Sequence, residues 1–206
     1  MKKFFAPLFA LFLFSNANAQ DFCATQMPED MITWLRDYKA ANPGANYFKS
    51  SNDVVYLPIK IHIAGTNAGG GYYKLGTLLD AMCTLNNQYA PYDWQFYIYE
   101  DINYINSDAV YNHTGSYQST INAQSVPNIV NMFFVADPSG ACGYFSGWGG
   151  PQNPSGGGRQ GFIAINNSCA QNLNTTIAHE LGHFFSLPHT FYGWEGRSAT
   201  DAPRAN

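Results

Sequence analysis

Charged residues are scarce in this sequence of 206 residues. Asp, Glu, Lys and Arg together make up 12% of it, the formal net charge is −4 at pH 7, and no basic cluster follows Lys2 and Lys3. An acidic chain without a run of Lys or Arg binds nucleic acid poorly, so we expect no nucleic-acid partner. Aromatic residues reach 16%, and this content combined with the low charge argues against disorder.

Three further patterns are missing. The apolar run Phe4–Phe14 is shorter than the roughly 20 residues that a membrane-spanning helix needs, so we expect no membrane span. The absence of a CxxC pair leaves a zinc finger or a thioredoxin-like site without support. The Gly- and Pro-rich stretch 146–160 is not followed by GK[ST], which argues against nucleotide binding.

The N-terminus has the pattern of a secretory signal peptide. A positive start and the apolar run precede the cleavage pattern Ala17-Asn18-Ala19, so we expect residues 1–19 to be removed and the protein to be secreted. The remaining length suits one domain with a sizeable core. We interpret residues 20–53 as a candidate pro-segment or N-terminal extension and 54–206 as the main domain.

Four cysteines, at positions 23, 83, 142 and 169, allow three disulfide pairings. Secretion permits disulfides. We favour Cys142–Cys169, because both residues lie in the segment that leads to a cluster of histidines.

Hydrophobic patterning predicts an α/β (α+β) protein. Apolar residues recur at helical spacing over 27–41 and 74–90, and the second helix is expected to bury Leu75, Leu78, Leu79, Met82 and Leu85. Strands are predicted at 54–65, 94–102, 128–137 and 161–168. This order suggests a mixed twisted sheet backed by helices. His62 lies within the first strand and is expected to be an ordinary strand residue, since no other ligand accompanies it.

Three of the five histidines fall between residues 179 and 189. In a helix over 175–185, capped by Asn172 or Asn174, His179 and His183 lie about 40° apart on one face. Ile177, Leu181, Phe184 and Phe185 gather on the opposite face, which packs into the core. Two histidines at this spacing can bind one zinc ion. Glu180 can then reach a zinc-bound water without taking a coordination position.

His189 can join this pair only if the helix ends before it. Pro188 cannot continue a helix and biases Leu187 away from helical angles, so it supplies the break. Three protein nitrogens and one water form the open arrangement of a catalytic zinc site. An alternative moves the third ligand to Glu195 or Asp201, whose spacing fits ligand patterns less well.

The segment His179-Glu180-x-x-His183-x-x-Ser186-x-x-His189 resembles the HExxHxxGxxH signature of metzincin zinc endopeptidases. Its flanks look most like the pappalysin family, and weaker similarity extends over 54–194. The resemblance implies Zn²⁺ held by His179, His183 and His189.

It further implies a secreted endopeptidase that hydrolyses internal bonds of a protein or peptide by a zinc-activated water, with Glu180 as the general base. It also implies a metzincin-like sheet of about five strands with a backing helix and an active-site helix. An antiparallel edge strand, placed at 142–148, is expected to bind extended peptide. A structural Ca²⁺ is left open.

Two departures from the signature bear on the function. Ser186 replaces the glycine that normally permits a left-handed turn, at a cost of about 1 kcal/mol. All five methionines precede His189, so the methionine-containing turn and the C-terminal subdomain are expected to be missing from this chain. These departures support an alternative, a secreted binding or adhesion module without catalysis on a metalloprotease scaffold.

The sequence around Cys23, DFCATQ, resembles the cysteine motif by which some metzincin pro-segments block zinc with a thiolate. The competing interpretation is a Cys23–Cys83 disulfide, which secretion favours. The sequence leaves both open.

Overall fold

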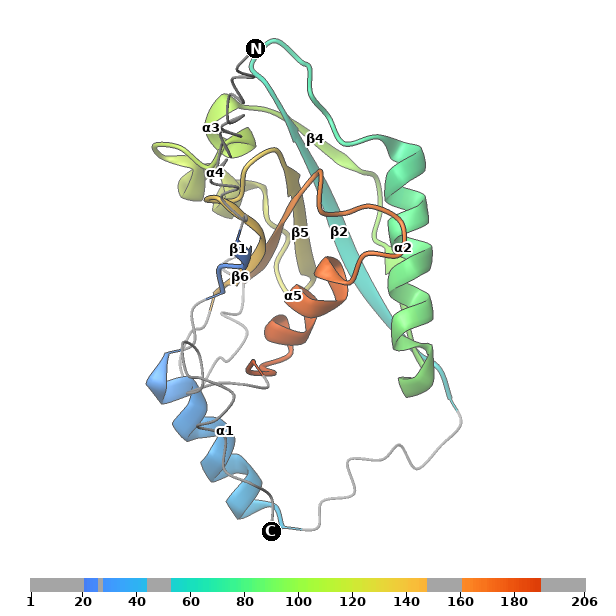
Figure 1. Ribbon diagram of the computed structural model, residues 1–206, viewed down its shortest axis with the longest axis vertical. Coiled ribbons are helices and arrows are strands. Elements are labelled where there is room, and N and C mark those ends of the chain that lie inside the picture. The colour runs from blue at the N-terminus through green and yellow to red at the C-terminus, as the bar shows by residue number, and fades with distance from the viewer. Residues whose placement is uncertain (1–20, 26–27, 44–52, 148–160, 190–206) are drawn as a thin grey trace, which may run out of the picture.

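The computed structural model describes residues 21–25, 28–43, 53–147 and 161–189 (Figure 1). The expected signal peptide, residues 148–160 of the Gly- and Pro-rich stretch, Glu195 and Asp201 all lie outside these ranges.

Seven strands form one mixed sheet in the order β1-β6-β7-β5-β2-β3, and β4 also pairs with β2. The strands are β1 (Asp21–Cys23), β2 (Val55–Gly65), β3 (Trp94–Ile98), β4 (Asn103–Asn106), β5 (Val130–Val135), β6 (Ala141–Ser146) and β7 (Phe162–Asn166). The helices are α1 (Glu29–Ala41), α2 (Leu75–Tyr89), the 3₁₀ turn η1 (Ala90–Tyr92), α3 (Asp108–Tyr111), α4 (Tyr117–Gln124) and α5 (Thr176–Phe184).

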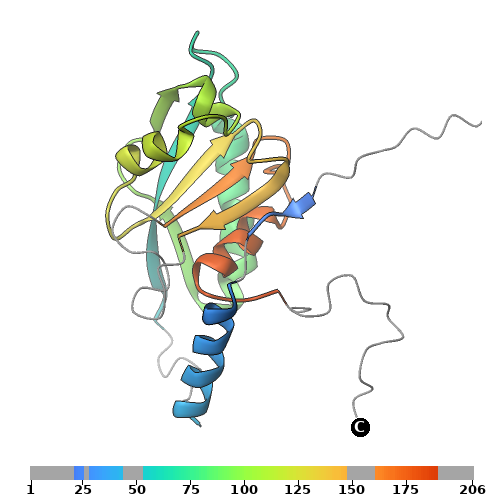
Figure 2. The same cartoon turned by 90° about the vertical axis from the view of Figure 1, so that its left-hand side faces the viewer.

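The sheet carries two helical layers (Figures 1 and 2). One core cluster joins alternate residues of β2, such as Ile59 and Ile61, to α2 and α5. The other joins the opposite face of the sheet, including Phe133, to α3 and α4. The expected mixed sheet with a backing helix, α2, and a second helix that carries His179 and His183, α5, is therefore confirmed. It has seven strands rather than five, because the short strands β1 and β4 add to it.

Strand β6 differs in direction from its neighbour β7. It runs antiparallel to β7, whereas the pairings of β2 with β3, β4 and β5, and of β5 with β7, are all parallel. The antiparallel strand expected at 142–148 is thus confirmed as Ala141–Ser146. The expectation that it forms the sheet edge was wrong, because β1 pairs in parallel along its outer side.

The long strand β2 confirms the strand predicted at 54–65. Its pairing with β5 begins only at Ile59, so the amide that Pro58 lacks is not needed on that side. His62 is a fully buried strand residue as expected. Its Nε2 lies 3.1 Å from Asn131 Oδ1, and Asn103 Nδ2 lies 3.0 Å from its Nδ1.

Two predictions about the middle of the chain need correction. On α2, Leu78, Met82 and Leu85 are buried, but Leu75 and Leu79 are each 50% exposed, because the helix contacts the sheet over a narrower stripe than assumed. The elements β4, α3 and α4 were not predicted. They are short and their sequences are largely polar, so they carry little periodic signal.

Among the helices that the structure describes, none is both long enough and apolar enough to cross a membrane.

Candidate metal centre

Helix α5 carries His179 and His183, and its other side is buried in the core. Ile177 and Leu181 are buried in the core on one side, as the helical wheel predicts. At the start of the helix, Asn174 Oδ1 accepts a hydrogen bond of 2.8 Å from the amide of Thr176. The expected N-cap at Asn172 or Asn174 was wrong, because the N-cap residue is Thr175, which makes no side-chain cap bond. Asn174, one residue earlier, nevertheless satisfies an amide that the helix itself leaves without a partner.

The end of α5 turns back through a left-handed residue. Ser186 has φ of 68°, its amide donates to His183 O at 2.9 Å, and the amide of Leu187 donates to Gly182 O at 2.9 Å. This pair of bonds is the Schellman motif, which normally uses glycine at the left-handed position. The turn therefore has the usual shape, and the serine bears a backbone strain of about 1 kcal/mol.

This turn brings three imidazoles together. His183 Nε2 lies 3.1 Å from His179 Nε2 and 3.1 Å from His189 Nε2. His183 Nδ1 lies 2.7 Å from the carbonyl oxygen of Leu187 and must donate to it, so in the neutral ring Nε2 carries a lone pair. This lone pair points at the other two imidazoles, an arrangement in which three ring nitrogens could bind one metal ion.

The donor set fits zinc. For Zn–N of 2.0–2.1 Å and Zn–S of about 2.3 Å, a tetrahedral site places nitrogens about 3.3 Å apart and sulfur about 3.6 Å from nitrogen. The two separations from His183 Nε2 to the other histidines are 3.1 Å each, and Cys23 Sγ lies 3.5 Å from His183 Nε2. The ligand atoms of Cys23, His179, His183 and His189 all lie within 4.8 Å of one another. In the described part of the chain, no comparable group supports the structural Ca²⁺ that the sequence left open.

The local electrostatics favour neutral imidazoles. Burial lowers the pKa of His183 to about 4, despite the hydrogen bond to Leu187, and burial followed by the charge of His189 lowers the pKa of His179. A metal binds the deprotonated ring nitrogen, so these shifts prepare both side chains for coordination.

Glu180 lies beside the cluster and is completely buried. Burial raises its pKa to about 7. Its Oε2 accepts from Thr25 Oγ1 at 2.8 Å and lies 3.5 Å from Cys23 Sγ, while Oε1 has no hydrogen-bond partner among the described residues. Gly143 of β6 makes this position available, because a Cβ there would come within 2.9 Å of Glu180 Cγ.

Strand β1 delivers Cys23 and Thr25 to the centre. Cys23 pairs with Gly143, and the amide of Ala24 donates to Gly143 O at 3.0 Å. The amide of Phe145 donates to Thr25 Oγ1 at 2.8 Å. Burial, followed by the charge of Glu180, raises the pKa of Cys23 to about 11. A nearby cation would be needed to hold this thiol as a thiolate at neutral pH.

The cysteine pairing is now decided for the described residues. Cys142 and Cys169 form a disulfide with Cα atoms 5.4 Å apart, which confirms the favoured pairing. The Cys23–Cys83 disulfide was wrong, since both cysteines are free. The physical reason is that β1 aligns Cys23 with β6, while Cys83 is exposed on α2.

The histidines line a cavity of about 670 Å³ together with Tyr89 and Tyr92. Sequence reasoning named His179, Glu180, His183 and His189, and the structure brings these four residues together. The sequence alone did not predict the role of Thr25 or the close approach of Gly143 to Glu180, because neither has a local sequence signal.

Comparisons with known proteins point in the same direction. No protein-family profile matches the chain. Over 198 residues it is 26% identical to an extracellular metalloprotease of Colletotrichum graminicola, covering 88% of this chain and 70% of that protein. A second extracellular metalloprotease of that fungus is 26% identical over 215 residues, covering 94% and 75%. One from Pyricularia oryzae is 26% identical over 168 residues, covering 79% and 59%. The chain is similar to extracellular metalloproteases.

Proposed function

We propose that this protein is a secreted zinc-dependent endopeptidase of the metzincin type, and that the structure represents its latent form. The observation that carries the proposal is the convergence of three Nε2 atoms beside a buried glutamate. Similarity to extracellular metalloproteases supports the same reaction class.

His179, His183 and His189 would hold the zinc. When bound, zinc supplies a Lewis acid for the scissile carbonyl and makes a water nucleophilic near neutral pH. The bond from His183 Nδ1 to Leu187 O fixes the ring and keeps Nε2 directed at the centre.

Glu180 is the general base in this proposal. It takes the proton from the attacking water and returns it to the leaving amine. Gly143 O and the Phe145 amide lie on the outer edge of β6, where they now pair with residues 23–25. These two groups would bind the main chain of an extended peptide once β1 is displaced.

Latency follows from the position of β1. Cys23 Sγ lies within 4.8 Å of the three histidine nitrogens, so as a thiolate, a strong zinc ligand, it would compete with water for the metal. Thr25 holds Glu180, and β1 covers the edge of β6. Residues 20–53 are therefore proposed to be a pro-segment whose removal activates the enzyme.

A pair of variants tests the reaction. Glu180→Gln keeps the three histidines, so zinc content should stay near one per chain while peptide hydrolysis falls at least 10²-fold. His183→Ala removes a ligand, so both zinc and hydrolysis should be lost. Zinc is measured by atomic absorption and hydrolysis on a fluorogenic peptide, after proteolytic removal of the N-terminal segment. Undiminished hydrolysis by Glu180→Gln would refute the assignment of the base.

The parent protein tests the competing function. If the complete protein, with the C-terminal subdomain that is expected beyond this chain, binds zinc and cleaves no peptide after the segment is removed, the site belongs to a binding module. The latency proposal has its own test in thiol labelling of Cys23. The thiol should be unreactive in the zinc-loaded, unprocessed protein and become reactive after zinc removal. A thiol that reacts equally in both states would show that it does not bind the metal.

A further inference from the structure

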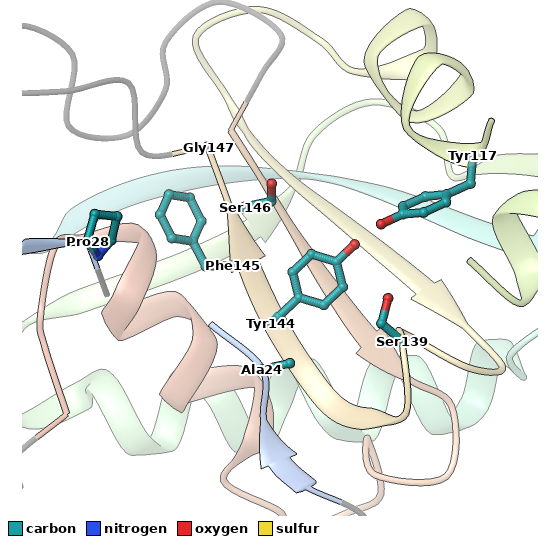
Figure 3. A pocket seen from close by; sticks show the side chains of 8 residues that line it. All are labelled: Ala24, Pro28, Tyr117, Ser139, Tyr144, Phe145, Ser146 and Gly147. Carbon is teal, nitrogen blue, oxygen red and sulfur yellow. The ribbon is translucent and has the colours of Figure 1, made fainter. Parts of the chain in front are cut away.

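A second cavity, of about 270 Å³, lies along β6 beside the metal centre (Figure 3). Tyr144 of β6, Tyr117 of α4 and Ser139 line it, and Figure 3 shows the two tyrosine hydroxyls directed toward each other. Tyr144 packs with the core cluster on the face of the sheet that carries α3 and α4, whereas the neighbouring Phe145 contacts Phe184 of α5. Phe145 also lines the cavity, so residues from both faces of β6 border it.

The strand that docks on β6 decides what enters this cavity. Ala24, which directly follows β1, lies beside Tyr144 and lines the cavity. Laterally adjacent residues of paired strands point to the same face of a sheet, whether the pairing is parallel or antiparallel. Any extended chain that replaces β1 on β6 must therefore direct one side chain to this place.

Alanine leaves most of the space empty. At about 30 Å³ for each water in the liquid, 270 Å³ corresponds to the volume of about nine waters, so the cavity can take a large side chain. The lining residues are all uncharged. A charged side chain would be buried there without a counter-ion, which is costly.

The walls favour an aromatic side chain with a polar group. The rings of Tyr117 and Tyr144 supply aromatic surface. Their hydroxyls bond to each other and, for Tyr144, to His113, so their remaining lone pairs and the Ser139 hydroxyl can accept from a polar tip that donates. His113 contacts both tyrosines and holds them in place. Its ring stacks on Tyr117 with centroids 4.3 Å apart, and its Nδ1 lies 3.0 Å from the Tyr144 hydroxyl.

We propose that this cavity is a specificity subsite that takes a tyrosine or tryptophan side chain of a peptide bound along β6. The proposal rests on the proposed endopeptidase function. Cys23, one residue before Ala24, reaches the histidines, so the subsite is expected to lie within about two residues of the scissile bond. Tyr117 and Tyr144 are its specificity-determining residues.

The experiment uses the full-length protein after proteolytic removal of the residues before Val54. A peptide library randomised around the cleaved bond should show enrichment of Tyr and Trp at one position near that bond. In Tyr117→Phe, which keeps the ring, kcat/KM for the Tyr peptide should fall about fivefold, as expected for one hydrogen bond. The matched Phe peptide should be cleaved as by the parent. Tyr97→Phe, which removes a hydroxyl elsewhere on the sheet, should change neither value.

A second variant fills the space instead of removing a group. Ser146→Phe, on the same strand and lining the same cavity, should shift the preferred residue at that position from aromatic to small, with thermal melting as the check on folding. Cleavage without any aromatic preference would overturn the subsite and leave the endopeptidase function standing. Failure to cleave any peptide would overturn both.

Discussion

Thr25→Val should partly activate the unprocessed protein. Valine keeps the shape of threonine and removes its hydroxyl, which donates to Glu180 Oε2 at 2.8 Å and accepts from the Phe145 amide at 2.8 Å. In this interpretation the hydroxyl holds both the general base and the substrate-binding edge of β6. Thr25 acts through Glu180, so we regard it as a positioning residue of the latent state.

The size of the effect follows from the bonds that are lost. A hydrogen bond to a charged group contributes about 1.5–3 kcal/mol. At 1.4 kcal/mol for each factor of ten, a loss of about 2 kcal/mol raises the ratio of open to closed protein about 25-fold. Hydrolysis by the unprocessed variant should rise by a similar factor, as long as the open state remains a minor one.

The assay compares a fluorogenic peptide before and after removal of the N-terminal segment. Thr25→Ser keeps the hydroxyl and should stay as latent as the parent. Cys23→Ala removes the thiol that would block the metal, so it should raise activity. After removal of the segment all four proteins should be equally active, because they then share one sequence. If Thr25→Val stays as inactive as the parent before processing, or if Thr25→Ser is activated equally, the hydroxyl does not hold the base.

Three further outcomes can be measured. Ser186→Gly relieves the left-handed strain at φ of 68° and should stabilise the protein by up to about 1 kcal/mol in urea unfolding, and a clear loss would contradict the strain. Gly143→Ala should displace Glu180, since the new Cβ would lie 2.9 Å from Glu180 Cγ. Hydrolysis should then fall at least tenfold while zinc is retained, and full activity would show that β6 moves to make room for the Cβ. Burial lowers the pKa of His62 and of His113 to about 4 from 6.5. Between pH 4 and pH 6.5 the unfolded chain therefore binds more protons than the folded protein. The free energy of unfolding should be greatest above pH 6.5 and should fall by about 3 kcal/mol for each histidine as the pH is lowered to 4. Imidazole titration by NMR checks this, and a pKa near 6.5 for either residue would exclude its contribution.

Much of the fold was readable where patterns are local and periodic. The alternation of Ile59, Ile61 and Ile63 predicted β2, and the apolar stripe of α5 predicted which side of that helix is buried. The burial of α2 was less accurate, because the width of a helix–sheet contact depends on the partner. The polar segment that forms β4, α3 and α4 was not predicted, since short elements there are stabilised by packing against the sheet.

The sequence by itself determined the local geometry of the metal centre. The spacing of His179 and His183 on a helix, and the break before His189, follow from helical geometry and the chemistry of proline, and they need no distant contact. Only the tertiary structure decided what faces these histidines. Cys23 and Thr25 reach Glu180 across more than 150 residues through the pairing of β1 with β6. Such a pairing depends on main-chain hydrogen bonds that every residue except proline can make, so no residue pattern in a three-residue strand specifies its partner.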